Sequence, residues 1–258
     1  MAKTSFKLPF LKQIWPDMLA FALGLGAAWF LEWKTTDLVW SLWLGSLALG
    51  YLTILGTILG AAWVGGHGIF HSDVPSAQRL WAVAAGTVGG LFLLGFFTLH
   101  FGGFHAGHAV FLSSFFPLDG MPENAFSDSF TSPAHLIGLV GEFILPVYGA
   151  FLLPAIIAER SYVFAPLMEA RKAVHEGLHN VRPRHYLRLG AGTKRSRKDP
   201  FTRPYVNVIR MHMLIFFFAG VHWLGADSFF SYATVYVVYF FPWKAFRAET
   251  TESSGQEI

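Results

Sequence analysis

The chain contains no cysteine, and only 14% of its 258 residues carry a formal charge. Without cysteine it cannot form a disulfide-stabilised scaffold or a thiolate-bound zinc module. An intrinsically disordered chain needs high charge and low hydrophobicity, so the low charge excludes that class as well. Soluble domains carry about 25% charged residues. This chain therefore has too few charges to cover a surface that faces water.

Hydrophobic residues are abundant instead, at 53% of the chain, with 17% aromatic residues. About 20 apolar residues span a bilayer as a helix. Six apolar stretches approach this length, at 15–30, 38–63, 80–100, 135–158, 205–225 and 228–243. The sequence therefore predicts an all-α, polytopic integral membrane protein with about six transmembrane helices, in a single helical membrane domain over residues 1–258.

The apolar run from 80 to 117 is too long for a single crossing. As one helix it would extend about 57 Å at 1.5 Å per residue, whereas the hydrocarbon core is about 30 Å thick. We expect the helix to break at Gly102-Gly103, where glycine lets the backbone turn. The segment 104–116 would then form a short re-entrant or interfacial helix within an outer loop over 101–134.

Basic residues predict the orientation, because Lys and Arg collect in cytoplasmic loops. Eleven of them lie between Arg160 and Arg203. Six spans put these residues on the same side as both termini. The sequence thus predicts a basic cytoplasmic loop over 158–204, two cytoplasmic termini and a location in a bacterial inner (plasma) membrane.

The basic loop also indicates which partners to expect. The run from Lys194 to Lys198 favours contact with anionic lipid headgroups at the inner face. No nucleic acid is expected, since basic loops are usual on this side of a membrane. The last residues, 248–258, are polar and predict a disordered tail.

Histidine is frequent, with 11 residues, and the predicted topology collects five of them at the outer side. These are His100, His105, His108, His135 and His222. Glu142 follows His135 by seven residues and shares its helical face. A carboxylate at that depth marks a functional site by default. Pro146 and Pro154 are expected to kink the same helix.

Imidazole and carboxylate groups are ligands that suit zinc, iron or copper(II). His105 and His108 are three residues apart, so one helix face can present both to one ion. The five outer histidines are therefore predicted metal ligands or proton carriers, with Glu142 as a ligand or general base. A haem held by two of the histidines is a less favoured alternative. The pattern predicts a metal-binding or proton-handling site near the outer leaflet and leaves catalysis open.

Two other functions remain open. The high phenylalanine content suits packing against partners, which favours a non-catalytic subunit or assembly factor of a larger membrane complex. The string H-E-G-L-H over 175–179 matches the H-E-x-x-H zinc motif. In a membrane zinc metalloprotease His175 and His179 would bind the metal and Glu176 would be the general base. His185 lies where the longer form of the motif has its third ligand.

Two parts of the chain resemble a large family of uncharacterised prokaryotic multipass membrane proteins. The first is the string His100-Phe-Gly-Gly-Phe104, followed by His108 and Phe111-Leu112. The second comprises Pro204-Tyr205, Arg210, His212, Leu224-Gly225 and a last apolar helix that ends at Lys244. The resemblance covers about half of the chain. It implies a multipass helical fold without an assigned activity, and it favours His100, His108 and His212 over the motif at His175.

Overall fold

The computed structural model describes residues 8–177, 213, 216–218, 220, 223–225 and 228–241, and every regular element in this part of the chain is a helix. The first elements are α1 (Leu8–Phe30), α2 (Thr35–Phe70), α3 (Ser76–Phe115) and the 3-10 helix η1 (Ser127–Phe130). A run of short helices follows: α4 (Pro133–Leu139), η2 (Val140–Ile144), α5 (Leu145–Tyr148), η3 (Gly149–Phe151) and α6 (Leu152–Ala158). The last are α7 (Arg160–Val163), α8 (Ala165–His175) and α11 (Phe229–Phe240). The all-α prediction is confirmed for these residues.

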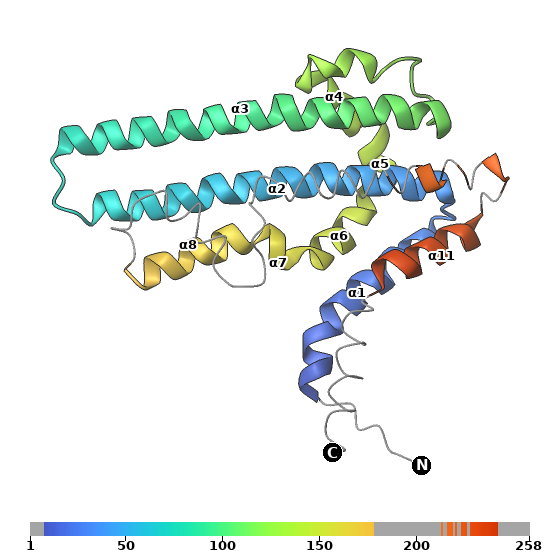
Figure 1. Cartoon of the computed structure of the whole chain (residues 1–258), viewed down its shortest axis with the longest axis horizontal. Coiled ribbons are helices and arrows are strands. Elements are labelled where there is room, and N and C mark those ends of the chain that lie inside the picture. The colour runs from blue at the N-terminus through green and yellow to red at the C-terminus, as the bar shows by residue number, and fades with distance from the viewer. Residues whose placement is uncertain are drawn as a thin grey trace.

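Helices α2 and α3 form a long antiparallel hairpin that dominates the molecule (Figure 1). They contain 36 and 40 residues, respectively. At 1.5 Å per residue they extend about 54 and 60 Å, which is roughly twice the thickness of a hydrocarbon core. Helix α8 lies along α2, and α1 lies beside α11 at the other end of the hairpin (Figure 1).

Three segments are long and apolar enough to cross a membrane: Thr35–Phe70, Ser76–Phe115 and Pro133–Ala158. They correspond to the second, third and fourth predicted spans. A shorter apolar helix, Ile14–Phe30, covers the first. Helix α11 has 12 residues within the sixth, and most of the fifth lies outside the described residues. Six spans therefore stay a prediction, whereas three helices able to span are observed.

The predicted helix break at Gly102-Gly103 is wrong, because α3 continues through both glycines to Phe115. The segment 104–116 is therefore no separate re-entrant helix. Residues 117–132 fold back over this part of α3 through η1. Phe130 of η1 lies against Gly107, with a ring atom 3.2 Å from the position of an added Cβ. The glycines thus permit close packing and do not turn the chain.

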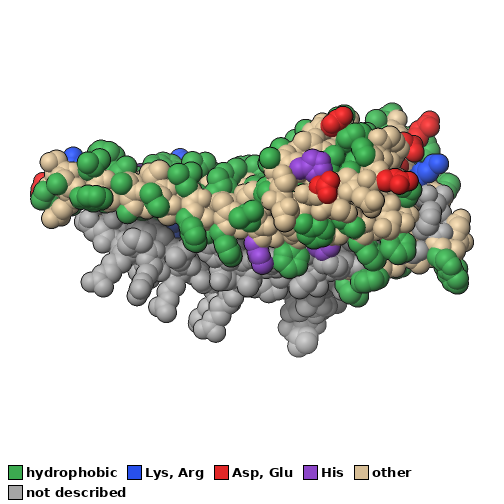
Figure 2. Space-filling view, turned by 90° about the horizontal axis from the view of Figure 1, so that it is seen from above, with side chains coloured by type: hydrophobic (Ala, Val, Ile, Leu, Met, Phe, Trp, Pro, Cys, Tyr) green, Lys and Arg blue, Asp and Glu red, His purple; other side chains and the backbone are tan. Residues whose placement is uncertain are grey.

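Burial divides α3 into two halves. None of its residues before Phe97 is buried, and large apolar side chains such as Trp81 and Phe92 are about three-quarters exposed. From Phe97 onwards, one side of the helix is packed against α2, η1 and α4. The half of α3 before Phe97 is thus bare, and hydrophobic side chains line it in Figure 2. A bare apolar helix surface of this kind is typical of a segment surrounded by lipid.

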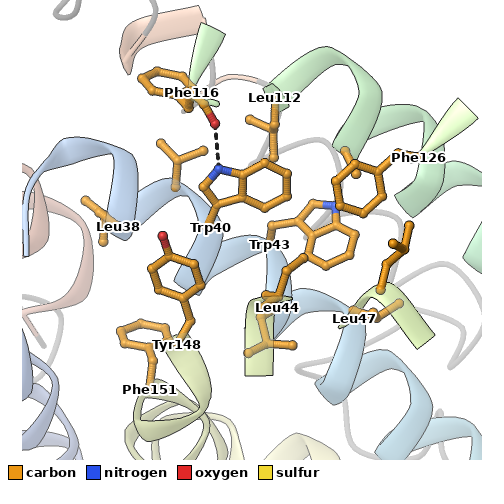
Figure 3. Packing of buried hydrophobic residues seen from close by; sticks show 14 of the residues in the cluster. Leu38, Trp40, Trp43, Leu44, Leu47, Leu112, Phe116, Phe126, Tyr148 and Phe151 are labelled. Atoms are coloured by element: carbon orange, nitrogen blue, oxygen red, sulfur yellow. Dashed lines mark hydrogen bonds between the residues drawn. The ribbon is translucent and has the colours of Figure 1, made fainter. Parts of the chain in front are cut away.

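The core lies where α2 meets the second half of α3, and two tryptophans of α2 are at its centre (Figure 3). The Trp40 indole donates a hydrogen bond to the carbonyl of Phe116, at 2.8 Å. Its ring stacks on Phe126, with ring centroids 5.6 Å apart. Leu112 of α3 is buried in the same cluster. These contacts fix the register of the hairpin at this end.

The segment 133–158 is apolar throughout but is not a regular helix. It contains the π-helical turn η2 and the 3-10 turn η3. Pro146 has no N–H to donate to the carbonyl of Glu142, four residues earlier. A π-helical turn at 140–144 is one way to accommodate this loss. The expected deviation near Pro146 is therefore observed.

Helix α8 packs against the second half of α2 and runs in the same direction. A Cβ atom on Gly60 would lie 2.9 Å from the carbonyl oxygen of Pro166, so only glycine allows this approach. Further along, Val64 is buried against Ala170 and Ala173. The basic segment that follows the fourth predicted span therefore begins as a helix docked on α2.

One ion pair joins α1 to α7, between Asp17 and Arg160. The Arg160 guanidinium also donates a hydrogen bond to the carbonyl of Ile157, at 2.7 Å. Both charged side chains are more than one-third exposed, so solvent screening limits their attraction. We expect Asp17→Asn to lower the free energy of unfolding by about 0.5–1 kcal/mol.

A double-mutant cycle with Arg160→Gln, measured by unfolding in detergent, tests this pair. The coupling energy should also be about 0.5–1 kcal/mol. The exposed pair of Lys172 and Glu176 is the matched control, and its coupling energy should be smaller. Additive effects of the two substitutions would show that the contact between Asp17 and Arg160 contributes nothing.

Candidate functional site

Among the predicted site residues that the structure describes, His105 is the most deeply buried, with no exposed surface. Its Nδ1 atom lies 3.0 Å from the carbonyl oxygen of Phe101, one helical turn earlier. A carbonyl only accepts hydrogen bonds, so Nδ1 is the protonated nitrogen of the neutral ring. The other nitrogen, Nε2, faces the hydroxyl of Ser46 on α2, at 3.4 Å. The ring thus bridges α3 and α2.

Trp43 of α2 holds the same histidine from a second direction. Its indole N–H donates a hydrogen bond to the carbonyl of His105, at 3.1 Å. The two rings meet edge to face, with centroids 5.7 Å apart. Trp43 and Ser46 are three residues apart, which places them on one face of α2. Neither Trp43 nor Ser46 was predicted to belong to the site. Their spacing of three residues is the only feature of the sequence that places them together.

His108 lies one turn beyond His105 and is also buried, with 7% of its surface exposed. The two imidazole rings have centroids 6.1 Å apart. The structure therefore brings together the two histidines whose spacing indicated one helix face. Among the predicted site residues in the described part of the chain, this is the pair whose rings are in contact.

His108 also lines an open groove on the surface of α3, with a volume of about 380 Å³. The groove is bounded by Leu99, His100, Gly103, Phe104, Gly107, His108 and Phe130. His100 is exposed and stacks on Phe96, with ring centroids 5.6 Å apart. His100 and His108 are eight residues apart, or about 12 Å along the helix. They share the groove but are too distant to bind the same ion.

His135 and Glu142 lie in other surroundings. His135 is exposed in the first turn of α4, where its Nδ1 atom lies 3.2 Å from the hydroxyl of buried Ser129. Glu142 is exposed within η2. Over residues 8–177 and the described positions after 212, no three His, Asp or Glu side chains lie close enough to hold a metal ion. The predicted ligand His222 lies outside the described residues, as does His212.

The H-E-x-x-H string does not continue a helix in the described residues. Helix α8 ends at His175, and Glu176 is its C-cap. Gly177 then adopts a φ of 68°, in the left-handed region that ends helices. The zinc motif needs both of its histidines on one helix face. His179 and His185 lie outside the described residues, and the described part of the motif gives no support to the protease alternative.

In the part of the chain that the structure describes, these observations define a helical protein with three helices able to cross a membrane and a buried histidine pair beside an open groove. The chain belongs to a family of unknown function (DUF6498), whose model matches residues 12–241. That range includes Glu142 and every histidine predicted to lie at the outer side. No curated protein and no solved structure matches the chain. The expectation of a family without an assigned activity is thus confirmed.

Proposed function

We propose that this is a bacterial inner-membrane protein with both termini in the cytoplasm, whose function depends on a proton-handling histidine site near the outer leaflet. The observation that carries the proposal is the contact between buried His105 and His108, whose rings are 6.1 Å apart. His108 also opens onto the groove that contains His100. In this assignment the basic segment 194–198 contacts anionic lipid headgroups at the inner face.

A line of polar groups supports this role. The Ser46 hydroxyl faces Nε2 of His105, the His105 ring contacts the His108 ring, and His108 lines the groove that has His100 at its edge. Imidazole accepts and donates protons near neutral pH, which makes histidine the usual residue for such transfers. Polar residues within membrane segments face the bundle interior or a cavity and mark ion or proton pathways. The side chains around this line are mostly aromatic or aliphatic.

Binding of a transition metal such as zinc, iron or copper is the second candidate function. The carbonyl of Phe101 accepts a hydrogen bond from Nδ1 of His105. In metal sites, a hydrogen bond of this kind on the nitrogen that does not bind the metal orients the histidine ligand. Nε2 is then the nitrogen with a lone pair. His108 follows three residues later and would be the second ligand. The remaining ligands would come from residues outside the described part, such as His222.

A role as a subunit or assembly factor of a larger membrane complex is a third candidate. The observation that favours it is the bare apolar half of α3 before Phe97. A neighbouring subunit would cover such a surface as readily as lipid does. Stoichiometric co-purification with another membrane protein, together with instability of the isolated chain, is the expected result for this role.

Histidine-labelled protein in bicelles provides the test of the site. We expect nitrogen NMR to show His105 protonated at Nδ1, and the His108 signals to respond to the pH of the medium. The substitution His105→Gln should change that response, because the neighbouring ring is removed. His175→Gln, on α8, is the matched control and should leave it unchanged.

Elemental analysis of the same preparations separates the two chemistries. A metal site should retain about one zinc, iron or copper ion per chain, and His105→Gln and His108→Gln should each lose it. A proton-handling site needs no metal. Protein that binds no metal and in which His108 shows no response to pH would overturn both assignments.

A further inference from the structure

A second pair of histidines lies at the far end of α2, beside the turn into α3. His67 and His71 are one helical turn apart, and their rings stack with centroids 4.0 Å apart and planes inclined by 11°. His67 is half-buried and His71 is exposed. Residues four apart on a helix are neighbours on one face. This pair shares no residue with the site proposed above.

The hydrogen bonding of His71 leaves a metal-binding nitrogen on its ring. Its Nδ1 atom lies 2.9 Å from the carbonyl oxygen of His67. The carbonyl can only accept, so Nδ1 carries the proton and Nε2 keeps its lone pair. A backbone carbonyl on the second ring nitrogen is the usual way in which proteins orient a histidine ligand. The ring of His71 is thus held in a tautomer that suits coordination.

The surface around the pair is open enough for an ion to enter. Apart from the chain neighbours and the backbone of α2 itself, no described atom lies within 4 Å of a Cβ placed on Gly65 or Gly66, beside His67. The nearest cation on the next helix, Arg79, is turned away onto the backbone. Its guanidinium donates to the carbonyl of Val74 at 3.2 Å and lies over the ring of Phe70. No third His, Asp or Glu of the described residues joins the pair.

We propose that His67 and His71 form a binding site for a borderline divalent transition-metal ion such as Cu²⁺, Ni²⁺ or Zn²⁺. Rotation of the His67 side chain out of the stack lets two imidazole nitrogens spaced by one helical turn bind the ion, and water completes its coordination shell. Imidazole suits copper, nickel and zinc, whereas Mg²⁺ and Ca²⁺ prefer oxygen ligands. The site therefore discriminates between these two groups of cations.

Titration of the full chain in lipid nanodiscs with Cu²⁺ and Ni²⁺ tests the proposal. We expect His67→Ala and His71→Ala each to weaken one binding event by about tenfold or more. The copper EPR spectrum of that site should show coupling to two nitrogens in the wild type and to one in each variant. The variant His71→Phe retains an aromatic ring for stacking but has no nitrogen, so it should weaken binding as much as His71→Ala does while the helix stays intact.

His175→Ala is the matched control, since His175 is also a surface histidine at a helix end. It should leave the number and affinity of the bound ions unchanged. Equal binding by the wild type and a chain that lacks both His67 and His71 would overturn the proposal. An equal loss in the His175→Ala variant would also do so, because it would indicate adventitious binding to surface histidines. His105→Gln should retain this ion, which separates the site from the outer one.

Discussion

Replacing Trp43 by alanine is expected to lower the free energy of unfolding by about 3–5 kcal/mol, the usual cost of removing a large buried aromatic side chain. Trp43 has no exposed surface. Its ring contacts Trp40, Phe126 and His105, with centroid distances of 5.7, 6.1 and 5.7 Å. The substitution would leave a cavity in the core of the α2–α3 hairpin.

The same substitution removes the donor to the carbonyl of His105. Trp43→Phe separates the two effects, because it keeps an aromatic ring and removes the N–H group. We expect the phenylalanine variant to lose about 1–3 kcal/mol, as is usual when a buried acceptor is left without its partner. In His-labelled protein the nitrogen signals of His105 should change in both variants, since Trp43 contacts its ring and its backbone.

Thermal unfolding in detergent, followed by fluorescence, measures these effects. Trp81→Ala is the matched control, because Trp81 is 75% exposed on the bare half of α3. Its effect should be within about 0.5 kcal/mol, as for most exposed positions. If Trp43→Ala and Trp81→Ala were equally destabilising, the register assigned here to α2 and α3 would be wrong.

Gly50→Ala is expected to destabilise the protein, although alanine is the better helix former. A Cβ atom at this position would overlap the ring of Phe101. Phe101 cannot move away easily, because it is fully buried and stacks on Phe97 with ring centroids 4.5 Å apart. Overpacking of this kind costs about 1–3 kcal/mol. It would also displace the Phe101 carbonyl that holds Nδ1 of His105.

Gly86→Ala is the matched variant on α3 and is expected to stabilise the protein. No neighbouring atom lies within 4 Å of a Cβ at Gly86, so only the gain in helix propensity remains, up to about 1 kcal/mol. Unfolding midpoints of both variants in the same detergent make the comparison. Stabilisation by Gly50→Ala would show that the close approach of α2 to Phe101 is absent in the folded protein.

The sequence predicted three of the long apolar segments correctly because their signals are local. Long apolar runs identified the segments that became α2, α3 and the helices between Pro133 and Ala158. The deviation near Pro146 followed from the missing N–H of proline. The break at Gly102-Gly103 was predicted wrongly, because bilayer thickness and glycine flexibility were its only basis. Neither property indicates that residues 117–132 pack onto α3 beyond Phe97.

The candidate site could be predicted only in part. The spacing of His105 and His108 on one helix is a local property, and their rings are in contact in the structure. The separate positions of His135 and Glu142 depend on how α4 lies against α3 and how η2 continues from α4, and residue spacing does not indicate either. The string at His175 is another example, because the left-handed φ of Gly177 ends the helix that its zinc-motif interpretation needs.

The sequence by itself determined that the described part of this protein is helical, with helices able to span a membrane, since composition and apolar run length suffice for that conclusion. Only the tertiary structure decided which polar groups meet inside it. Trp43, Ser46 and His105 come together across about 60 positions of the chain because α2 and α3 pack in one particular register. That register results from the packing of Trp40, Phe101 and Phe126 in one core. Such packing joins segments that are distant in the sequence, so it is decided only when the chain folds.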